Sequence, residues 1–146
     1  MTLLPNETVT TKPAIDKAHG KVLTYGLGLG YFAFMASAKQ EVDSVTIVER
    51  SADVIELFKT WLLPYFPNKD KIRIVCEDAF SYAENVAPQE CYDFVFADIW
   101  HDVGDGKELY LKFKDLERLS PKTEYTYWLE ATILCYLRPE LWPPRI

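Results

Sequence analysis

Short, strongly apolar runs alternate along the chain with segments whose apolar residues recur every three or four positions. The runs are rich in β-branched and aromatic residues and predict four buried strands, at residues 21–25, 44–49, 71–76 and 92–99. The segments between them predict three helices, at residues 31–39, from Ser51 to the turn before Pro64, and at residues 80–86. Strands that alternate with helices favour a parallel sheet with right-handed crossovers and helices on both faces.

The two ends of the chain carry weaker patterns. Residues 1–20 are polar and interrupted by prolines and a glycine, so they predict a lead-in segment with one short helical turn at residues 14–18. After the fourth strand we expect a loop at 102–106, helices at 107–119 and 124–137, and an irregular cover at 139–146. No fifth run rich in Val and Ile follows. The expected fold is therefore α/β, a shortened Rossmann-like parallel sheet in the order 3-2-1-4 with a helical C-terminus.

The composition indicates a single folded domain across residues 1–146. With 49% hydrophobic and 14% aromatic residues, the sequence is far too apolar for a disordered chain. Its formal charge of −6 disfavours a long surface that neutralises phosphates. We therefore expect no nucleic-acid partner.

Cysteine usage and hydropathy bear on the compartment. The three cysteines, Cys76, Cys91 and Cys135, are odd in number and include no Cys-x-x-Cys pair, which favours reduced thiols over disulfides or zinc. The first residues lack the basic and apolar regions of a secretory signal, and no apolar run reaches the roughly 18 residues of a membrane span. We expect a soluble cytoplasmic protein with no membrane partner and no bound metal.

The most informative segment is a glycine-rich turn between the first predicted strand and the helix that follows it. Gly26, Gly28 and Gly30 allow a tight bend and let a ligand approach the backbone without meeting a Cβ atom. Dinucleotide-binding folds place their third glycine one residue later, where this chain has Tyr31, so a pyrophosphate-binding turn is disfavoured. The alternative is a plain turn between strand and helix, with no ligand.

Acidic residues end the three other predicted strands. Glu49 lies 23 residues after Gly26, at a position where an acid can accept both hydroxyls of a ribose. Asp78 and Asp98 end the third and fourth strands. Ligands gather at the carboxyl ends of parallel strands, so these acids and the glycine turn predict one site. In the alternatives, Asp78 only caps the next helix, and Asp98 only binds nearby backbone amides.

These residues together resemble a known family. Residues 22–30 with Glu49, Asp78, Ala79 and Asp98 are similar to the nucleotide-binding half of the class I S-adenosylmethionine-dependent methyltransferases, in particular their spermidine synthase-like branch. The resemblance covers residues 20–115. It implies that S-adenosylmethionine is the cofactor, with its methionine part along the glycine turn, its ribose on Glu49 and its adenine near Asp78 and Ala79. It also implies that Asp98 lies near the sulfonium and the acceptor.

Two departures from the family pattern matter. Many methyltransferases carry an acid two residues before the first glycine, whereas this chain has Thr24. The spermidine synthase-like branch often lacks that acid. Aminopropyltransferases follow the fourth strand with a motif like Asp-Ser-Ser-Asp-Pro, whereas this chain continues from Asp98 with Ile-Trp-His-Asp. The second difference disfavours polyamine chemistry.

The expected activity is methyl transfer to an unknown small-molecule acceptor, with Asp98 as the catalytic residue. Trp100 and His101 are candidates for binding the acceptor, although an aromatic residue is more often core and a lone loop histidine is more often solvated. Two alternatives stay open: a non-catalytic or partner-dependent cofactor-binding domain, and an aminopropyltransferase. An uncovered edge at the fourth strand would also favour a homodimer.

Overall fold

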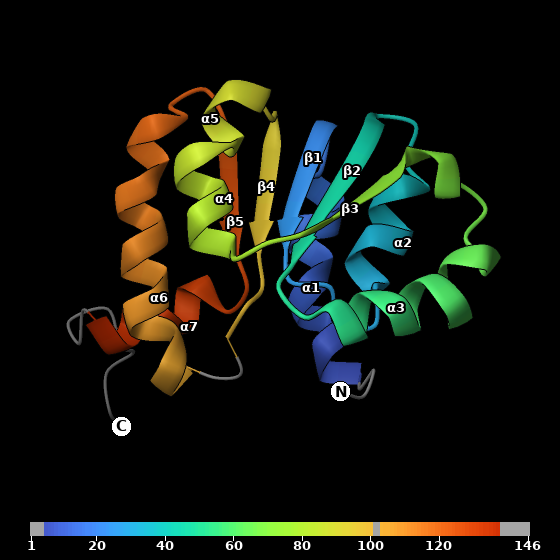
Figure 1. Ribbon diagram of the computed structural model, residues 1–146. Coiled ribbons are helices and arrows are strands. Elements are labelled where there is room, and N and C mark those ends of the chain that lie inside the picture. Colours follow the sequence, from blue (N-terminus) through green and yellow to red (C-terminus); the bar gives the residue numbers. More distant parts are fainter. Residues whose placement is uncertain (1–4, 101–102, 138–146) are drawn as a thin grey trace.

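Five parallel strands form one sheet in the order β3-β2-β1-β4-β5 (Figure 1). The structure is a computed structural model that describes residues 5–100 and 103–137. The α/β Rossmann-like fold expected from the sequence is confirmed, with a fifth strand added beside the fourth. The strands are β1 Gly20–Tyr25, β2 Val42–Glu49, β3 Ile72–Cys76, β4 Phe94–Ala97 and β5 Glu124–Tyr127.

Helices cover both faces of the sheet (Figure 1). One face packs against α1 Pro5–Lys17, α2 Tyr31–Ser37 and α3 Ala52–Trp61. The other packs against α4 Ala79–Asn85, α5 Ala87–Glu90, α6 Val103–Leu116 and α7 Glu130–Leu137. Short 3₁₀ turns follow α3, precede β3 and follow α6, at Leu63–Tyr65, Lys69–Lys71 and Glu117–Leu119.

The apolar character of β1 follows from its central position. Val22 joins the core on the side of α1 to α3, whereas Leu23 and Tyr25 join the core on the side of α4 to α6. A strand that is covered on both faces needs apolar residues at successive positions rather than alternate ones. The run at residues 21–25 therefore predicted the strand correctly.

The prediction that residues 124–137 form one helix is wrong. Their first four residues form β5, which pairs with β4 from Phe94 opposite Glu124 to Ala97 opposite Tyr127. Leu129, with a φ of 57°, separates this strand from α7. Tyr127 is buried, and its hydroxyl donates to a carboxylate oxygen of Glu117 at 2.5 Å. Because β5 covers β4, the expected reason for a homodimer does not hold.

The N-terminal segment also differs from its prediction. Residues 5–17 form a helix of 13 residues rather than a lead-in with one short turn. Pro13 lies inside this helix, and Ala14, Ile15 and Ala18 pack into the core against β1 and α2. Burial of these three residues, which the polar composition of the segment obscures, holds α1 on the sheet.

Three further predictions concern the rest of the chain. The expected loop at 102–106 is wrong where it is described, because α6 begins at Val103. The expected cover at 139–146 lies outside the described residues. All three cysteines are free thiols. In the described part of the chain, no helix is long and apolar enough to cross a membrane, and no group of three metal-ligating side chains occurs.

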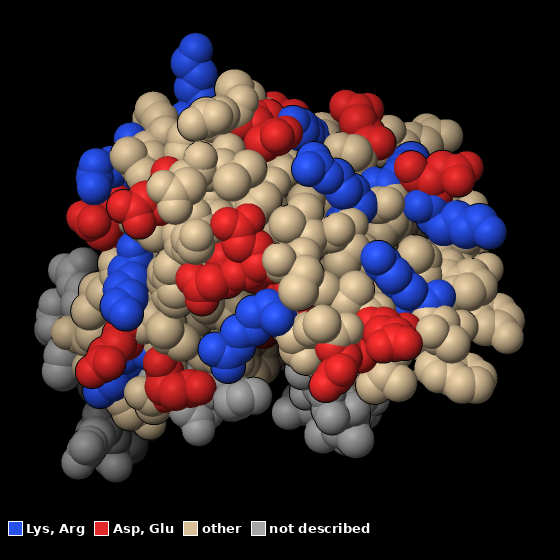
Figure 2. Space-filling model, in the orientation of Figure 1, with Lys and Arg blue, Asp and Glu red and all other residues tan. Residues whose placement is uncertain are grey.

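Charged side chains of both signs are mixed over the face of the molecule shown in Figure 2. Lys and Arg lie among Asp and Glu there, separated by neutral residues, and neither sign forms a continuous area on this face. The face shown therefore has no broad basic region that would follow a phosphate backbone. The absence of a nucleic-acid partner stays a prediction.

Candidate functional site

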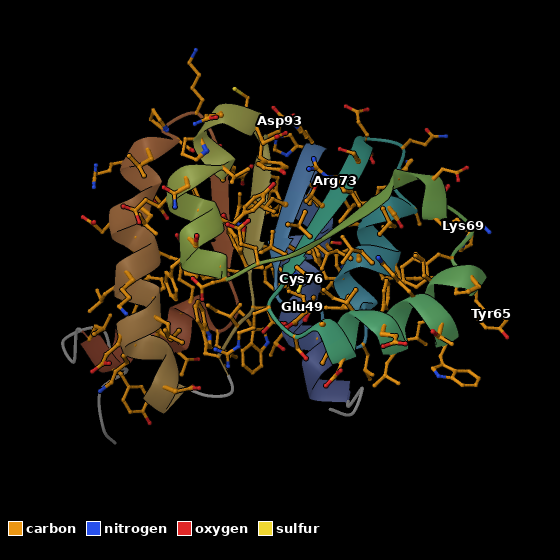
Figure 3. All side chains as sticks on the ribbon, in the orientation of Figure 1. Glu49, Tyr65, Lys69, Arg73, Cys76 and Asp93 are labelled. Atoms are coloured by element: carbon orange, nitrogen blue, oxygen red, sulfur yellow. The ribbon has the colours of Figure 1, made fainter. Side chains whose placement is uncertain are left out.

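A cavity of about 610 Å³ opens at the carboxyl ends of the central strands. Figure 3 shows Glu49 and Cys76 at this end of the sheet and Asp93 at the opposite end. Most of the residues expected from the sequence line the cavity, namely Gly26, Gly28, Glu49, Asp78, Ala79, Asp98 and Trp100. Gly30 is not part of this lining, and His101 lies outside the described residues.

The three positions of the turn are occupied by glycine for different structural reasons. Gly26 has a φ of 95°, and a Cβ atom there would collide with the backbone oxygen of Asp98. Gly30 has a φ of 78°, and its Cβ would lie 2.5 Å from the ring of Phe58. Both positions therefore require glycine because of packing and backbone conformation alone. Gly28, with a φ of 53°, lines the cavity and is the glycine best placed for contact with a ligand.

Glu49 joins the glycine turn to the start of α3. Its Oε1 accepts a hydrogen bond from the backbone N–H of Leu27 at 3.2 Å, and its Oε2 accepts one from the N–H of Ser51 at 2.9 Å. A carboxylate has about four acceptor sites, so each oxygen keeps capacity for a further hydrogen bond. Glu49 is thus held in place by the backbone and can still accept two hydroxyls from a ligand.

Asp78 performs the structural role considered as its alternative. It is the N-cap of α4, and its Oδ2 accepts the N–H of Ser81 at 3.0 Å. The same residue is exposed and lines the cavity beside Ala79 and Phe80. One N-cap bond leaves a carboxylate with further acceptor sites, so capping and ligand binding are compatible.

Asp98 and Trp100 follow β4 into the cavity. The backbone N–H of Asp98 donates to the carbonyl of Tyr25 at 3.0 Å, which continues the pairing of β4 with β1 to the edge of the cavity. The indole of Trp100 is only 3% exposed, donates to the carbonyl of Trp128 at 2.9 Å and stacks on Tyr127. Trp100 is therefore mainly a core residue that also contributes to the lining of the cavity.

The charged residues around the cavity are mostly acidic. Five carboxylates and one guanidinium line it: Glu49, Glu77, Asp78, Asp98, Asp105 and Arg50. Such a lining favours a cationic ligand over an anionic one. Burial raises the pKa of Tyr25, which directly precedes the glycine turn, well above its ordinary value. Its side chain packs in the core on the side of α4 to α6 and is not part of the cavity lining.

Three further parts of the chain line the cavity, although the sequence did not predict them. Thr11 comes from α1, Trp128 follows β5, and Asp105 and Leu109 come from α6. Thr11 and Trp128 belong to the two segments whose structure was predicted wrongly. A polar residue in a segment expected to be a lead-in gives no local signal of a site, since its position depends on how the helix packs.

Comparisons with known proteins give no family. No family model matches this sequence, and no curated protein matches it. Among solved structures, the chain is similar to a conserved hypothetical protein of Streptococcus pyogenes at 15% sequence identity and a TM-score of 0.46. The match covers 66% of this chain and 61% of that one, so this chain spans less than two thirds of that protein. The function is inferred from the cavity and its residues.

Proposed function

We propose that this protein is an S-adenosylmethionine-dependent methyltransferase that acts on a small-molecule acceptor. The observation that carries this proposal is the position of Glu49 at the end of β2. Its two carboxylate oxygens line the cavity, are held by the backbone of the glycine turn and of α3, and keep acceptor sites for a ribose.

The other residues of the cavity suit the rest of this cofactor. About 610 Å³ lies within the range of cofactor sites. Asp78 can accept from an adenine amino group, while Ala79 and Phe80 supply apolar surface for the ring. Gly28 allows close approach to the backbone, and the acidic lining suits a sulfonium cation.

The contribution of the protein to methyl transfer is mainly positional. When bound, S-adenosylmethionine supplies a methyl group on a positively charged sulfur. Glu49 and the glycine turn would orient the cofactor, while Trp100 and Trp128 limit access of water on the side of β5. Asp98 would hold an acceptor or take its proton on a carboxylate oxygen, since it ends the strand beside the glycine turn.

Asp98→Asn tests this division of roles. Turnover is measured as release of S-adenosylhomocysteine from S-adenosylmethionine with a panel of amine, hydroxyl and carboxyl acceptors. We expect the wild type to turn over at least one acceptor class, and the variant to be about 100-fold slower, as for a lost acid or base. Cofactor affinity should be nearly unchanged, because Glu49 and Asp78 hold the adenosine.

Asp115→Asn is the matched control, because Asp115 lies on the exposed side of α6 and pairs only with Arg118 at 3.8 Å among the described residues. It should keep wild-type turnover. Cofactor binding without turnover on any acceptor class would contradict the enzyme proposal and favour the alternative of a non-catalytic or partner-dependent binding domain.

A further inference from the structure

An exposed apolar surface lies on α3 and on the 3₁₀ turn that follows it. Leu57, Trp61 and Tyr65 recur every four residues, and they are 60%, 67% and 81% exposed. The N–H of Tyr65 donates to the carbonyl of Leu62 at 3.0 Å, which continues the turns of α3, and Leu62 is also exposed. Residues four apart lie on one side of a helix, so these four side chains form one surface, which we call the α3 surface.

The α3 surface is additional to the side of α3 that packs on the sheet. Ile55 and Phe58 of α3, and Phe66 after it, are buried in the core. A helix at the surface of a protein usually carries polar residues away from its buried side. In the described part of the chain, α3 instead exposes a second set of apolar residues, which is typical of a helix that packs against more than one neighbour.

The α3 surface lies at the outer end of the molecule. Tyr65 points away from the sheet at this end in Figure 3, and Figure 2 shows mainly neutral residues at the same corner. Phe34 of α2 adjoins it, because its exposed ring lies 5.0 Å from that of Phe66. Leu57, Trp61 and Tyr65 are not part of the described cavity lining, so this surface is separate from the candidate site.

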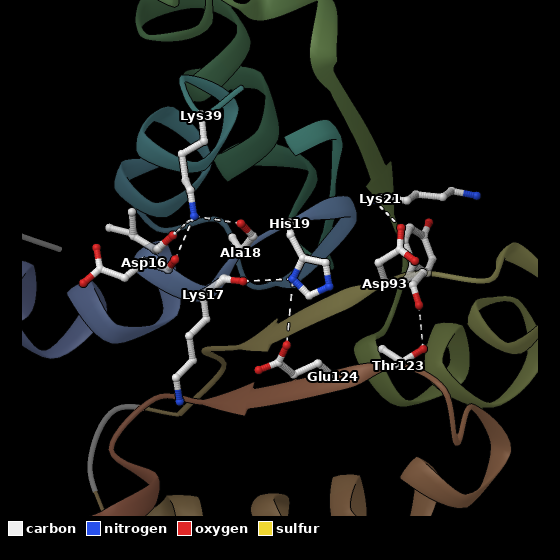
Figure 4. A network of polar contacts seen from close by, with 11 residues as sticks. Asp16, Lys17, Ala18, His19, Lys21, Lys39, Asp93, Thr123 and Glu124 are labelled. Atoms are coloured by element: carbon white, nitrogen blue, oxygen red, sulfur yellow. Dashed lines mark hydrogen bonds and ion pairs between the residues drawn. The ribbon is translucent and has the colours of Figure 1, made fainter. Parts of the chain in front are cut away.

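The amino ends of the strands have a different character. Polar side chains there bind groups of the same chain (Figure 4). The ammonium of Lys39, for example, donates to the carbonyls of Ile15, Asp16 and Ala18 at 2.7–2.9 Å. Such a surface gains little from a partner, whereas the α3 surface leaves apolar carbon in water, and burial of apolar carbon is the main driving force of association.

The size of the α3 surface suits a contact between two copies of the chain. A whole aromatic side chain has about 150–250 Å² of surface, so Trp61 and Tyr65 together expose roughly 300 Å². With the leucines and Phe34 the exposed apolar area reaches roughly 500 Å², toward the upper end of what a monomer shows. Two such surfaces in contact bury roughly 1,000 Å², which is enough for a specific but weak interface.

The charges beside the α3 surface allow it to pair with itself. Asp53, Glu56 and Lys59 are exposed on the same helix and include both signs. A two-fold axis brings the same surface of two copies together, so a border of one sign would repel its copy. A border of both signs places acids of one copy near a base of the other.

We infer that the α3 surface is the contact between two copies of this chain, which form a homodimer about a two-fold axis. This contact differs from the one expected at the fourth strand, whose edge β5 covers. It does not rest on the proposed function. Because the area is at the low end for a specific interface, the dimer dissociates on dilution.

Sedimentation velocity of the full chain, from low to high micromolar concentration, tests this inference. The mass of the wild type should rise from that of one chain to that of two. Leu57→Lys places a charge in the contact and should raise the dissociation constant of the dimer by about 10-fold or more. Tyr65→Lys should do the same, and its exposed position makes the test independent of whether the Leu57 variant folds.

Leu111→Lys is the matched control. Leu111 is 52% exposed on α6, which packs on the other face of the sheet, so this variant adds the same charge at a similar exposure. Its dissociation constant should stay within about 2-fold of the wild-type value, as for an ordinary surface substitution. Tyr65→Phe keeps the ring and should dimerise as the wild type does.

Three results would overturn the homodimer or its position. A wild type that stays monomeric at high micromolar concentration would show that no second copy occupies the α3 surface. Wild-type dimerisation of both lysine variants on the α3 surface, or an equal loss in Leu111→Lys, would place the contact elsewhere.

Discussion

Glu49 shows how one side chain can serve both the fold and the site. Its carboxylate accepts from Leu27, 22 residues earlier in the chain, and from Ser51, two residues later. These bonds hold the glycine turn against the start of α3. A structural role of this kind does not compete with ribose binding, because a carboxylate with one hydrogen bond on each oxygen still has acceptor sites.

The glycine turn shows that the role of a single glycine cannot be predicted from its spacing in the sequence. The spacing of Gly26, Gly28 and Gly30 predicted close approach of a ligand, yet Gly26 and Gly30 are required by contacts with Asp98 and Phe58. The sequence contains no signal that separates a glycine needed for a ligand from one needed for packing. Only Gly28 both lines the cavity and lacks such a packing role in the described geometry.

Gly30→Ala is expected to destabilise the protein by about 2–4 kcal/mol, from a left-handed backbone and a collision in the core. Phe58 cannot move aside easily, since it is 2% exposed and packs edge-on against Phe66. Gly28→Ala should cost only about 1–2 kcal/mol, from its backbone conformation. Urea unfolding followed by tryptophan fluorescence measures both values. Equal losses of stability in the two variants would show that the contact with Phe58 does not add to the cost of a side chain at Gly30.

At the scale of elements, the sequence predicted correctly those strands whose apolar residues stand next to one another in the chain, and it missed elements that depend on distant contacts. The first four strands contain short apolar runs that are visible in the sequence, and those of β1, β2 and β4 are buried on both faces of the sheet. The strand β5 has only four residues, Glu-Tyr-Thr-Tyr, and its burial comes from pairing with β4. Helix α1 is polar and contains Pro13, so its stability comes from packing and from Lys39. Tertiary contacts of this kind cannot be predicted from a short window.

Lys39→Met should loosen α1 while leaving the sheet intact. The substitution removes three hydrogen bonds from an ammonium to carbonyls at the end of the helix and should lower stability by about 1–3 kcal/mol. Hydrogen exchange detected by mass spectrometry should show that exchange in residues 5–17 is faster in the variant than in the wild type. Exchange in β1 and β4 should change less.

Lys12→Met is the control for this variant. Lys12 lies on α1 itself, but its ion pair with Asp16 at 2.7 Å is exposed, and exposed pairs contribute little. It should leave exchange in α1 nearly unchanged. If the Lys39 variant also kept wild-type exchange in α1, the attachment described here would not be what holds the helix.

At the scale of the whole molecule, two segments missed by sequence reasoning complete one cavity. Helix α1 brings Thr11 to it, and the chain after β5 brings Trp128. Strand β5 also covers the edge that was expected to need a second subunit. The described walls of the cavity are therefore formed within a single chain.

The central claim is that this cavity binds an S-adenosyl ligand through Glu49, and calorimetric titration with S-adenosylhomocysteine tests it most directly. We expect one binding site per chain. Glu49→Gln should weaken binding by about 10-fold, because an amide accepts on only one atom. The control Glu56→Gln, on the exposed side of α3, should bind as the wild type does. No binding by the wild type at high micromolar ligand, or equal binding by wild type and Glu49→Gln, would contradict the claim.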